Sequence, residues 1–470
     1  MCVVTARDRF RVLVVGKTGV GKSSLISFAF GVDRNAISHY ARGVSDIVTE
    51  HVSDHNPRFV AHDSMGFERG ETMNLDTVRK FLEARSGGTI PLKDRVHMIW
   101  SISLILASYC LQIFRLCVAV PFAEFPAFKN ADDNMIQLAW SLKVPVIVVF
   151  TQYDRLVHRM EEILIDEDSM LDDEHFDRIA ADRAEAKFLE SCVKPLEARN
   201  PGMPYERTFG LRGEKITPPS QTALRRLLST TQRLVQKSIG GDVWVVTAMA
   251  QRVSALQKID ASIQVGMKRY WQGLASAASF GNSTLETCLV TIHQEIAESW
   301  NFYDPRDLLN GPVFRNRVKA LAQLAMPEEM DAGSWFENID HIQTLLGLGT
   351  AIAAPVAPAV AAIGLSALFL HWLSRTIHRT PEILRCLMAY ILDITLVMDQ
   401  LFLVVLATHP PRALTAADID TALESYMLLN LGDVHKDVRI YVTRAKFLQI
   451  LAANSAEQKV KELLQKYATR

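Results

Sequence analysis

The stretch FRVLVVGKTGVGKSSLISFAF, residues 10–30, decides the fold of this chain. It opens with a short, mostly apolar run, Phe10 to Val15, which predicts a buried strand. The octapeptide GKTGVGKS follows and matches G-x-x-x-x-G-K-S without a gap. The apolar residues after it supply one face of a predicted helix. A strand, a glycine-rich loop and a helix in this order predict an α/β domain with a mostly parallel sheet.

This loop has the composition of a phosphate-binding loop. Glycines let successive backbone N–H groups surround phosphate oxygens, and the next helix points its positive N-terminus at them. We expect Lys22 to reach the β- and γ-phosphates and the Ser23 hydroxyl to ligate Mg²⁺. By itself the loop does not distinguish GTP from ATP. The predicted nucleotide-binding residues here are Gly16, Lys17, Thr18, Gly19, Val20, Gly21, Lys22, Ser23 and Ser24.

A predicted hairpin carries the metal-binding candidates. Residues 46–52 and 58–62 flank the polar turn SDHNP, and the tetrapeptide DSMG follows directly. Asp63 stands where a carboxylate at the end of a strand could hold Mg²⁺ through water, and Gly66 could offer its N–H to the γ-phosphate. With Ser45 ahead of the hairpin, the predicted metal set is Ser23, Asp63 and Ser45.

Ser45 and Lys22 are the predicted catalytic residues. Thr49 is the alternative hydroxyl to Ser45, but strand alternation is expected to place Thr49 inside the hairpin. Phe67 follows the DSMG glycine, where Ras-like enzymes carry a glutamine that orients the attacking water. Phenylalanine cannot do this, so we expect hydrolysis that is slow or depends on a partner or on dimerisation.

The segment VIVVFTQYD, residues 146–154, predicts a buried strand that ends in a polar corner. Thr151 and Asp154 match the guanine-reading pattern N/T-K-x-D, and Gln152 stands in place of its lysine. A carboxylate accepts from guanine N1–H and the exocyclic amine, whereas adenine would leave it unpaired at a cost of a few kcal/mol. The alternative role of Asp154 is a helix cap. The order of the three motifs favours the guanine reader.

The last base-contacting loop has no recognisable S/T-A-K motif. The candidate VVTAMAQ, residues 245–251, has apolar spacings that predict one long helix from Val246 to Tyr270, capped by Asp242. We therefore expect the sixth strand near residues 204–209 and the last helix of this domain at residues 222–236. The loop at Thr208 to Leu211 would then contact the base.

On these motifs the chain resembles a P-loop GTPase of the TRAFAC class with a Ras-like fold. It is similar to the large G-domain-containing proteins of basidiomycete fungi. The resemblance is carried by GVSDI (residues 43–47), HDSMGFE (62–68) and FTQYD (150–154), and continues into AMAQR (248–252) and VGMKRYW (265–271). It covers most of the chain and implies binding of GTP or GDP.

One segment departs from this resemblance. In the fungal relatives the strand HxIW runs straight on into a segment like CVAVPFAE, but here the stretch from Ser101 to Arg115 intervenes. We interpret 101–115 as an insertion inside the strand, of the kind that a retained intron leaves, and expect it to loop out. The rival interpretation is a membrane helix over residues 98–114, at the short limit for spanning.

The rest of the chain predicts helices. Residues 155–200 are charged and predict a solvated helical excursion, so the G domain is expected over residues 1–240 and a helical domain over residues 241–470. Residues 342–374 form a long uncharged run with a central proline pair. This run is either a buried hairpin or a membrane-associated one. The helix expected at 381–406 carries charges that suit a bundle better than lipid.

Composition narrows the function classes. The 470 residues carry a net charge of −1, which argues against a general nucleic-acid binder. Six scattered cysteines and an arginine-containing start predict an intracellular protein without a signal peptide, cytoplasmic or peripherally membrane-associated. The expected partners are guanine nucleotide, Mg²⁺, a second G domain, and a membrane surface through residues 342–374.

The sequence therefore predicts a GTP-binding, Mg²⁺-dependent switch coupled to a helical effector domain. Two alternatives stay open. One is a non-hydrolysing scaffold or membrane-associated tethering protein in which the nucleotide is structural. The other is an ATP-using P-loop protein.

Overall fold

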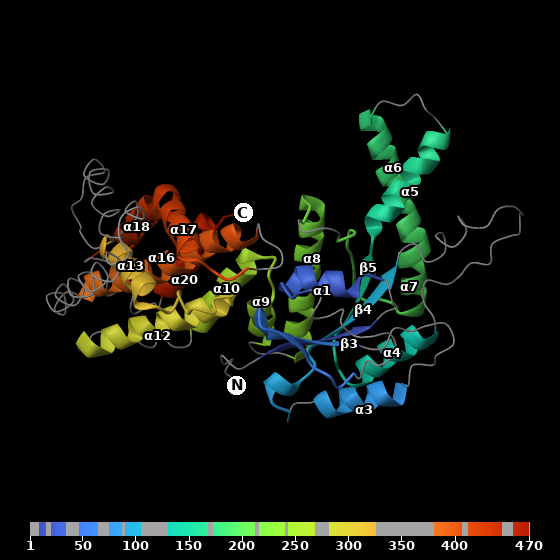
Figure 1. The fold of residues 1–470 in the computed structure, drawn as a ribbon, viewed down its shortest axis with the longest axis horizontal. Helices are drawn as coiled ribbons and strands as arrows, with labels where there is room; N and C mark the ends of the chain where they lie inside the picture. The colour runs from blue at the N-terminus through green and yellow to red at the C-terminus, as the bar shows by residue number, and fades with distance from the viewer. Residues whose placement is uncertain are drawn as a thin grey trace, which may run out of the picture. The chain divides into compact units, whose positions relative to one another are not determined.

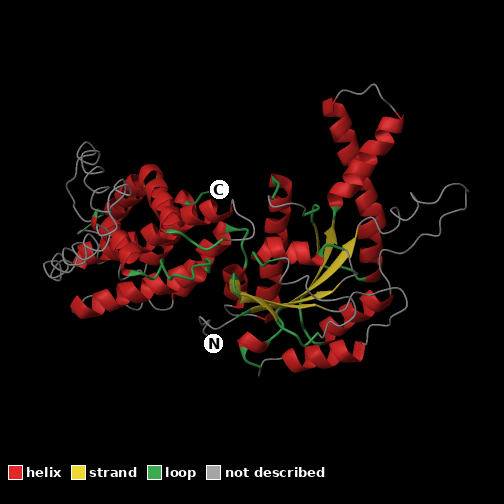
Figure 2. Cartoon of the chain, viewed as in Figure 1, coloured by secondary structure: helices red, strands yellow, loops and turns green. Residues whose placement is uncertain are grey.

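The fold was analysed in a computed structural model. It describes residues 9–15, 20–33, 47–63, 75–86, 90–104, 130–167, 173–211, 216–239, 243–267, 282–325, 380–406, 412–443 and 455–469. The chain divides into two compact units, Met1–Val253 and Ser254–Arg470. The first is a sheet covered by helices and the second is helical throughout its described part (Figures 1 and 2). The predicted α/β domain with a mostly parallel sheet, followed by an all-α region, is confirmed.

The sheet of the first unit has the strand order β2-β3-β1-β4-β5-β6. Only the β2–β3 pair is antiparallel, as the predicted hairpin requires, and the other neighbours are parallel. The strands are β1 (Phe10–Val15), β2 (His51–Ser53), β3 (Asn56–Asp63), β4 (Met98–Leu104), β5 (Val146–Thr151) and β6 (Tyr205–Arg207). Parallel pairing brings the carboxyl ends of β1, β3, β4 and β5 to one edge of the sheet.

Helices cover both faces of this sheet because successive strand residues alternate between the faces. Phe10, Val12 and Val14 pack with α1 (Lys22–Phe30), α8 (Pro218–Ile239) and α9 (Val243–Ala250). Leu13 and Val15 face the opposite core. That core includes residues of α3 (Leu75–Arg85), α4 (Asn130–Ser141), α5 (Tyr153–Glu167), α6 (Asp173–Phe188) and α7 (Lys194–Arg199).

The excursion between β5 and β6 is helical, as predicted. Its helices α5 and α6 form an antiparallel pair that projects beyond the sheet (Figure 1). The π-helical turn η2 (Leu189–Val193) then leads into α7. Charged pairs such as Arg183 with Glu167 lie on the surface of these helices.

Strand β4 corrects the interpretation of residues 101–115. Residues 101–104 belong to β4 and pair with β5 in register up to Leu104 opposite Thr151. The buried Ile102 continues the apolar face of the strand, so the stretch after Trp100 completes the sheet. The expectation that the segment loops out is therefore wrong for residues 101–104, and a membrane helix over 98–114 is wrong at this end, whereas the insertion itself stays a prediction. Residues 105–129 lie outside the described part.

A second correction concerns the long helix expected from Val246 to Tyr270. It is interrupted between α9 and α10 (Ala255–Met267). The Arg252 N–H donates to the Ala29 carbonyl at 2.9 Å, and Gln251 Oε1 accepts from the Val253 N–H at 2.7 Å. These bonds draw the backbone out of the helix. As a result α9 belongs to the sheet unit, held there by Asn56, whose amide donates to the carbonyl of Ala250 at 2.7 Å.

The helical unit packs around one central apolar helix, α16 (Thr380–Leu406). Around it lie α10, α12 (Asn282–Trp300), α13 (Pro312–Gln323), α17 (Ala416–Leu429), α18 (Leu431–Tyr441) and α20 (Ala456–Tyr467). Within the described residues one helix, Leu384–Val405, is long and apolar enough to cross a membrane, and most of it is buried inside this unit. The run at 342–374 lies outside the described part.

Candidate functional site

The described end of the phosphate loop has the geometry of an anion site. Gly21 is the N-cap residue of α1 with φ +96°, a left-handed conformation that glycine adopts without strain. Lys22 and Ser23 begin the helix, and its first turn carries no acidic side chain. The positive helix N-terminus thus stands without a competing carboxylate on its own first turn. Residues 16–19 lie outside the described part.

Of the metal candidates, Ser23 lies in the first turn of α1 and Asp63 at the end of β3. Asp63 is the last residue of β3 and lies opposite Val14 of β1, one residue before β1 ends. Ser45 and Gly66 fall outside the described residues. Thr49 is exposed and precedes β2, so its expected place inside the hairpin was wrong because the strand begins only at His51.

The base-reading corner lies at the end of β5. The Thr151 hydroxyl donates to the Val20 carbonyl at 2.6 Å, which ties this corner to the end of the phosphate loop. Gln152 has φ +62°, a left-handed conformation uncommon for a residue with a side chain. This conformation turns the chain from β5 into α5 at once. Residues held in sparsely populated backbone conformations are concentrated at functional sites.

Asp154 lies inside the first turn of α5 and is not its N-cap residue. Its carboxylate accepts a hydrogen bond from the N–H of Gly210 in the loop after β6. That loop is the stretch predicted to contact the base. Thr208 fastens this loop to β5 and α5, because its N–H donates to the Phe150 carbonyl at 2.7 Å and its carbonyl accepts from the Tyr153 N–H at 3.0 Å.

An aromatic and ionic cluster supports this corner from α6 and β6. The Tyr153 hydroxyl lies 3.1 Å from Glu185 Oε2, and Glu185 also pairs with Arg207. The Arg207 guanidinium stacks over the Tyr153 ring at 4.2 Å. Burial raises the pKa of Tyr153 to about 12, with Arg207 opposing the rise and Glu185 adding to it. The charged excursion is therefore joined to the base corner, which nothing in the sequence pattern indicated.

A second network joins β1, β3 and the segment before β2. Glu50 pairs with Arg11 at 2.7 Å and lies 3.6 Å from Arg85 of α3. Arg11 also lies 3.1 Å from His62 Nε2, and the other ring nitrogen, Nδ1, donates to the Ile47 carbonyl at 2.9 Å. Burial lowers the pKa of His62 to about 4, an effect that the Ile47 bond opposes and the two arginines reinforce. His62 is thus neutral at neutral pH. It is the residue immediately before Asp63 in β3.

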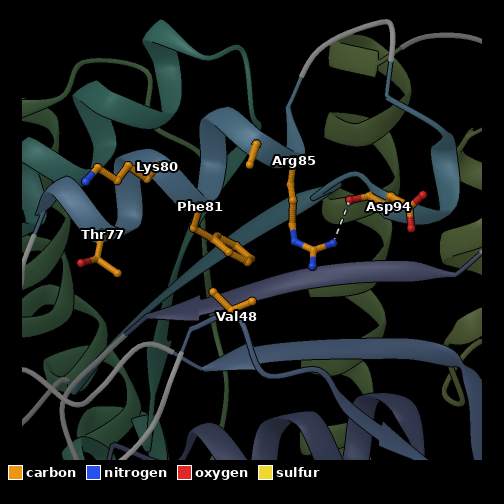
Figure 3. A pocket seen from close by; sticks show the side chains of 7 residues that line it. Val48, Thr77, Lys80, Phe81, Arg85 and Asp94 are labelled. Atoms are coloured by element: carbon orange, nitrogen blue, oxygen red, sulfur yellow. Dashed lines mark hydrogen bonds between the residues drawn. The ribbon is translucent and has the colours of Figure 1, made fainter.

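A pocket of about 440 Å³ adjoins this network (Figure 3). The side chains of Val48 and Phe81 face each other across it, and Arg85 donates to the Asp94 carbonyl at 3.3 Å. Its lining residues are Val48, Thr77, Lys80, Phe81, Ala84, Arg85 and Asp94. None of these lining residues is a predicted nucleotide-binding residue.

Protein side chains alone do not form a metal-binding cluster in the described residues. In the described part of the chain, no three His, Cys, Asp or Glu side chains gather as a metal site. Mg²⁺ usually binds through few protein ligands together with phosphate oxygens, so the predicted set of Ser23, Ser45 and Asp63 fits that donor chemistry.

Two protein families match parts of the chain. Residues 11–152 match the family described as 50S ribosome-binding GTPase. Residues 308–469, within the helical unit, match a family described only as a domain of unknown function (DUF8505). The first match spans the phosphate loop, the DSMG element and the base corner as far as Gln152.

Individual relatives agree with the first family match. GTPase Der of Mesoplasma florum is 27% identical over 163 residues, covering 35% of this chain and 32% of that protein. GTPase Der of Ureaplasma urealyticum is 22% identical over 153 residues, covering 33% of this chain and 29% of that protein. The chain thus spans about a third of the length of these curated relatives. Together with the strand order and the motif order, these matches show that the N-terminal part of this chain is a P-loop GTPase domain.

Proposed function

We propose that the sheet unit binds GTP with Mg²⁺ and acts as a nucleotide switch coupled to the helical unit. The observation that carries this proposal is the 2.6 Å hydrogen bond from the Thr151 hydroxyl to the Val20 carbonyl. It joins the base corner to the end of the phosphate loop, so one nucleotide can reach both. Of the two roles considered for Asp154, its bond to Gly210 across the sheet edge supports base reading over capping.

Each site residue then has a chemical role. The loop from Gly16 to Ser24 surrounds the phosphates, and Lys22 neutralises charge on the β- and γ-phosphates. Ser23, Ser45 and Asp63 hold Mg²⁺, which lowers the cost of charge developing on the phosphates during transfer. Gly66 offers its N–H to the γ-phosphate. Thr151, Gln152 and Asp154 define the base site, with the Gln152 stem over the ring.

Nucleotide competition tests the choice of base. We expect GTP to displace a fluorescent GDP analogue and ATP to fail at equal concentration. In Asp154→Asn the acceptor becomes an amide, so guanine loses a charge-assisted bond and xanthine gains a donor for its extra carbonyl. We expect preference to shift toward xanthosine triphosphate by about tenfold or more. A chain that prefers ATP would refute the assignment of Asp154.

Hydrolysis is proposed to be slow or assisted, because Phe67 stands where a water-orienting glutamine is usual. Single-turnover phosphate release, measured across protein concentrations, tests this and also detects dependence on self-association. A rate that rises with protein concentration would show that self-association assists hydrolysis, as a second G domain would. No release under any condition would leave a scaffold in which the nucleotide is structural.

The finer family and location are also proposals. The motifs at residues 43–47, 62–68 and 150–154 support a place among the large G-domain proteins of basidiomycete fungi. We propose an intracellular protein whose run at 342–374 is a hairpin, either buried or membrane-associated. Flotation with liposomes in the GDP and GTP states separates these two, because only a membrane-associated hairpin would carry the protein to the lipid fraction.

A further inference from the structure

The loop after β6 meets the carboxylate of Asp154 at unusually close range. The Gly210 N–H donates to Asp154 Oδ1. A Cβ atom placed on Gly210 would lie 2.6 Å from Oδ2 and 2.9 Å from Oδ1. Carbon and oxygen atoms in van der Waals contact lie well beyond 3 Å, so any side chain at position 210 would have to displace the carboxylate.

The need for glycine here comes from this contact and not from the backbone. Among the described residues, the glycines with positive φ are Gly21, Gly31 and Gly202. Gly210 is not one of them, so its backbone conformation is open to alanine. The carboxylate of Asp154 is therefore the specific obstacle to a side chain at this position.

The loop cannot easily yield, because β5 and the first residue of α5 both bond the backbone of Thr208. The Thr208 N–H donates to the Phe150 carbonyl, and the Thr208 carbonyl accepts from the Tyr153 N–H. The rings of Phe209 and Tyr153 also form a T-shaped pair with 5.7 Å between centroids. Position 210 is thus fixed relative to the first turn of α5, and the carboxylate is the part that would have to move.

We propose that Gly210 is a positioning residue for guanine selectivity. Its N–H holds Oδ1 and so sets the rotation of the Asp154 carboxylate, and its missing side chain leaves the room in which Oδ2 lies. Selectivity between bases needs hydrogen-bonding groups held closely in place. This inference rests on the proposed function, since Asp154 must read the base.

The test compares binding of GDP and of inosine diphosphate, which lacks the exocyclic amine of guanine, to the full chain. We expect Gly210→Ala to lower the preference for GDP over inosine diphosphate by about tenfold. The reason is that a displaced carboxylate loses its hydrogen bond from the exocyclic amine of guanine. Gly202→Ala is the control. Gly202 has φ +73° with nothing within 4 Å of its Cβ position, so this change strains the backbone without touching Asp154. It should lower thermal stability and leave the preference unchanged.

A double variant keeps the inference testable if Gly210→Ala folds poorly. Asp154→Ala removes the carboxylate, so adding Gly210→Ala to it should cost no further thermal stability. A further loss in the double variant would overturn the inference, as would a Gly210→Ala protein with an unchanged preference. A wild-type protein that shows no preference for GDP would instead refute the proposed function.

Discussion

In the sheet unit, Asp154 and Thr151 stand at the edge where parallel strands end, whereas in the helical unit Asp393 lies in the middle of an apolar core. Asp154 is partly exposed and is held by a single loop N–H. Asp393 is fully buried and accepts from the Tyr426 hydroxyl at 2.6 Å and from His435 Nε2 at 2.9 Å. One carboxylate thus stays partly exposed, as the proposed base reader must, and the other is fully used in bonds inside the bundle.

The same contrast extends to the cations. In α16 the buried Arg385 donates to the Val442 carbonyl at 2.7 Å, beyond the end of α18, so its donor is used inside the bundle. Lys22 begins α1 at a partly exposed helix N-terminus. The difference teaches that the buried charges of the helical unit bond other parts of the same bundle, whereas the charges proposed to meet phosphate and base in the sheet unit stay partly exposed.

The strongest test of this contrast is Asp393→Ala. The change leaves the His435 N–H and the Tyr426 hydroxyl buried without their acceptor, so we expect a loss of about 3–5 kcal/mol in unfolding free energy. Hydrogen exchange of peptides from α16 and α17 in the full chain measures it. GDP affinity should change far less than this stability, because the sheet unit has its own core.

Asp420→Asn is the control for this variant. Asp420 pairs with Arg317, but about a third of its side chain is exposed. The expected loss is at most about 1 kcal/mol, because exposed pairs contribute little. If the two variants lose the same stability, burial does not set the difference between the carboxylates. If Asp393→Ala weakens GDP binding, the two units are coupled more strongly than their separate cores indicate.

The second test, Lys22→Ala, should change nucleotide binding and leave the stability of the helical unit unchanged. Removing the charge that meets the β- and γ-phosphates should weaken GTP binding about a hundredfold, equivalent to ~2.7 kcal/mol. In the absence of nucleotide, protection of the helical unit from hydrogen exchange should be the same in the variant and the wild type. Lys237→Ala, an exposed lysine near the end of α8, is the matched control and should bind normally. Equal affinities in the two variants would contradict the role of Lys22.

Much of the sheet unit could be predicted because its determinants are local. The apolar run at 146–151 becomes β5, and the sixth strand falls within 204–209 as expected. The helix expected at 222–236 is the core of α8. Strand periodicity and glycine spacing act over a few residues, so they can be read from one sequence.

The contacts that complete the site could not be predicted, because they join residues far apart in the chain. Gly210 meets Asp154 across 56 positions, and Arg11 meets His62 across 51. No spacing rule encodes such pairs. The break after Ala250 was missed for the same reason, since its cause is the bond from Arg252 to the distant Ala29. Helical periodicity continues through the break, and tertiary hydrogen bonds override it.

The third test uses pH on the helical unit. His293 Nε2 donates to the Leu309 carbonyl at 2.6 Å, and Nδ1 accepts from the Tyr390 hydroxyl at 2.8 Å. Burial lowers the pKa of His293 to about 4, the Leu309 bond opposes this shift, and Arg315 and Lys319 reinforce it. Below pH 6.5 the unfolded chain binds a proton that the folded chain refuses, so stability falls as the pH falls toward 4.

Between pH 7.5 and pH 5, the titration of His293 should lower the free energy of unfolding by about 2 kcal/mol, measured by hydrogen exchange of α12. In His293→Gln the amide can keep both hydrogen bonds without titrating, so the loss attributable to this site should disappear. An unchanged pH dependence in that variant would show that other groups carry it. A pH-dependent loss of stability confined to the sheet unit would contradict the role assigned to this buried group of the helical unit.

The smallest effect is expected from Glu50→Gln, which probes whether the edge of the sheet unit also uses charge for packing. Burial raises the pKa of Glu50, but Arg11 and Arg85 outweigh it and leave a net lowering. The paired carboxylate therefore adds stability above its unfolded pKa and loses it as the pH falls. Because about a third of the side chain is exposed, the gain is screened, and we expect a loss of about 0.5–1 kcal/mol at neutral pH. Salt should shrink the difference between the two proteins. A loss above about 3 kcal/mol, independent of salt, would place Glu50 with Asp393 as a group on which packing depends.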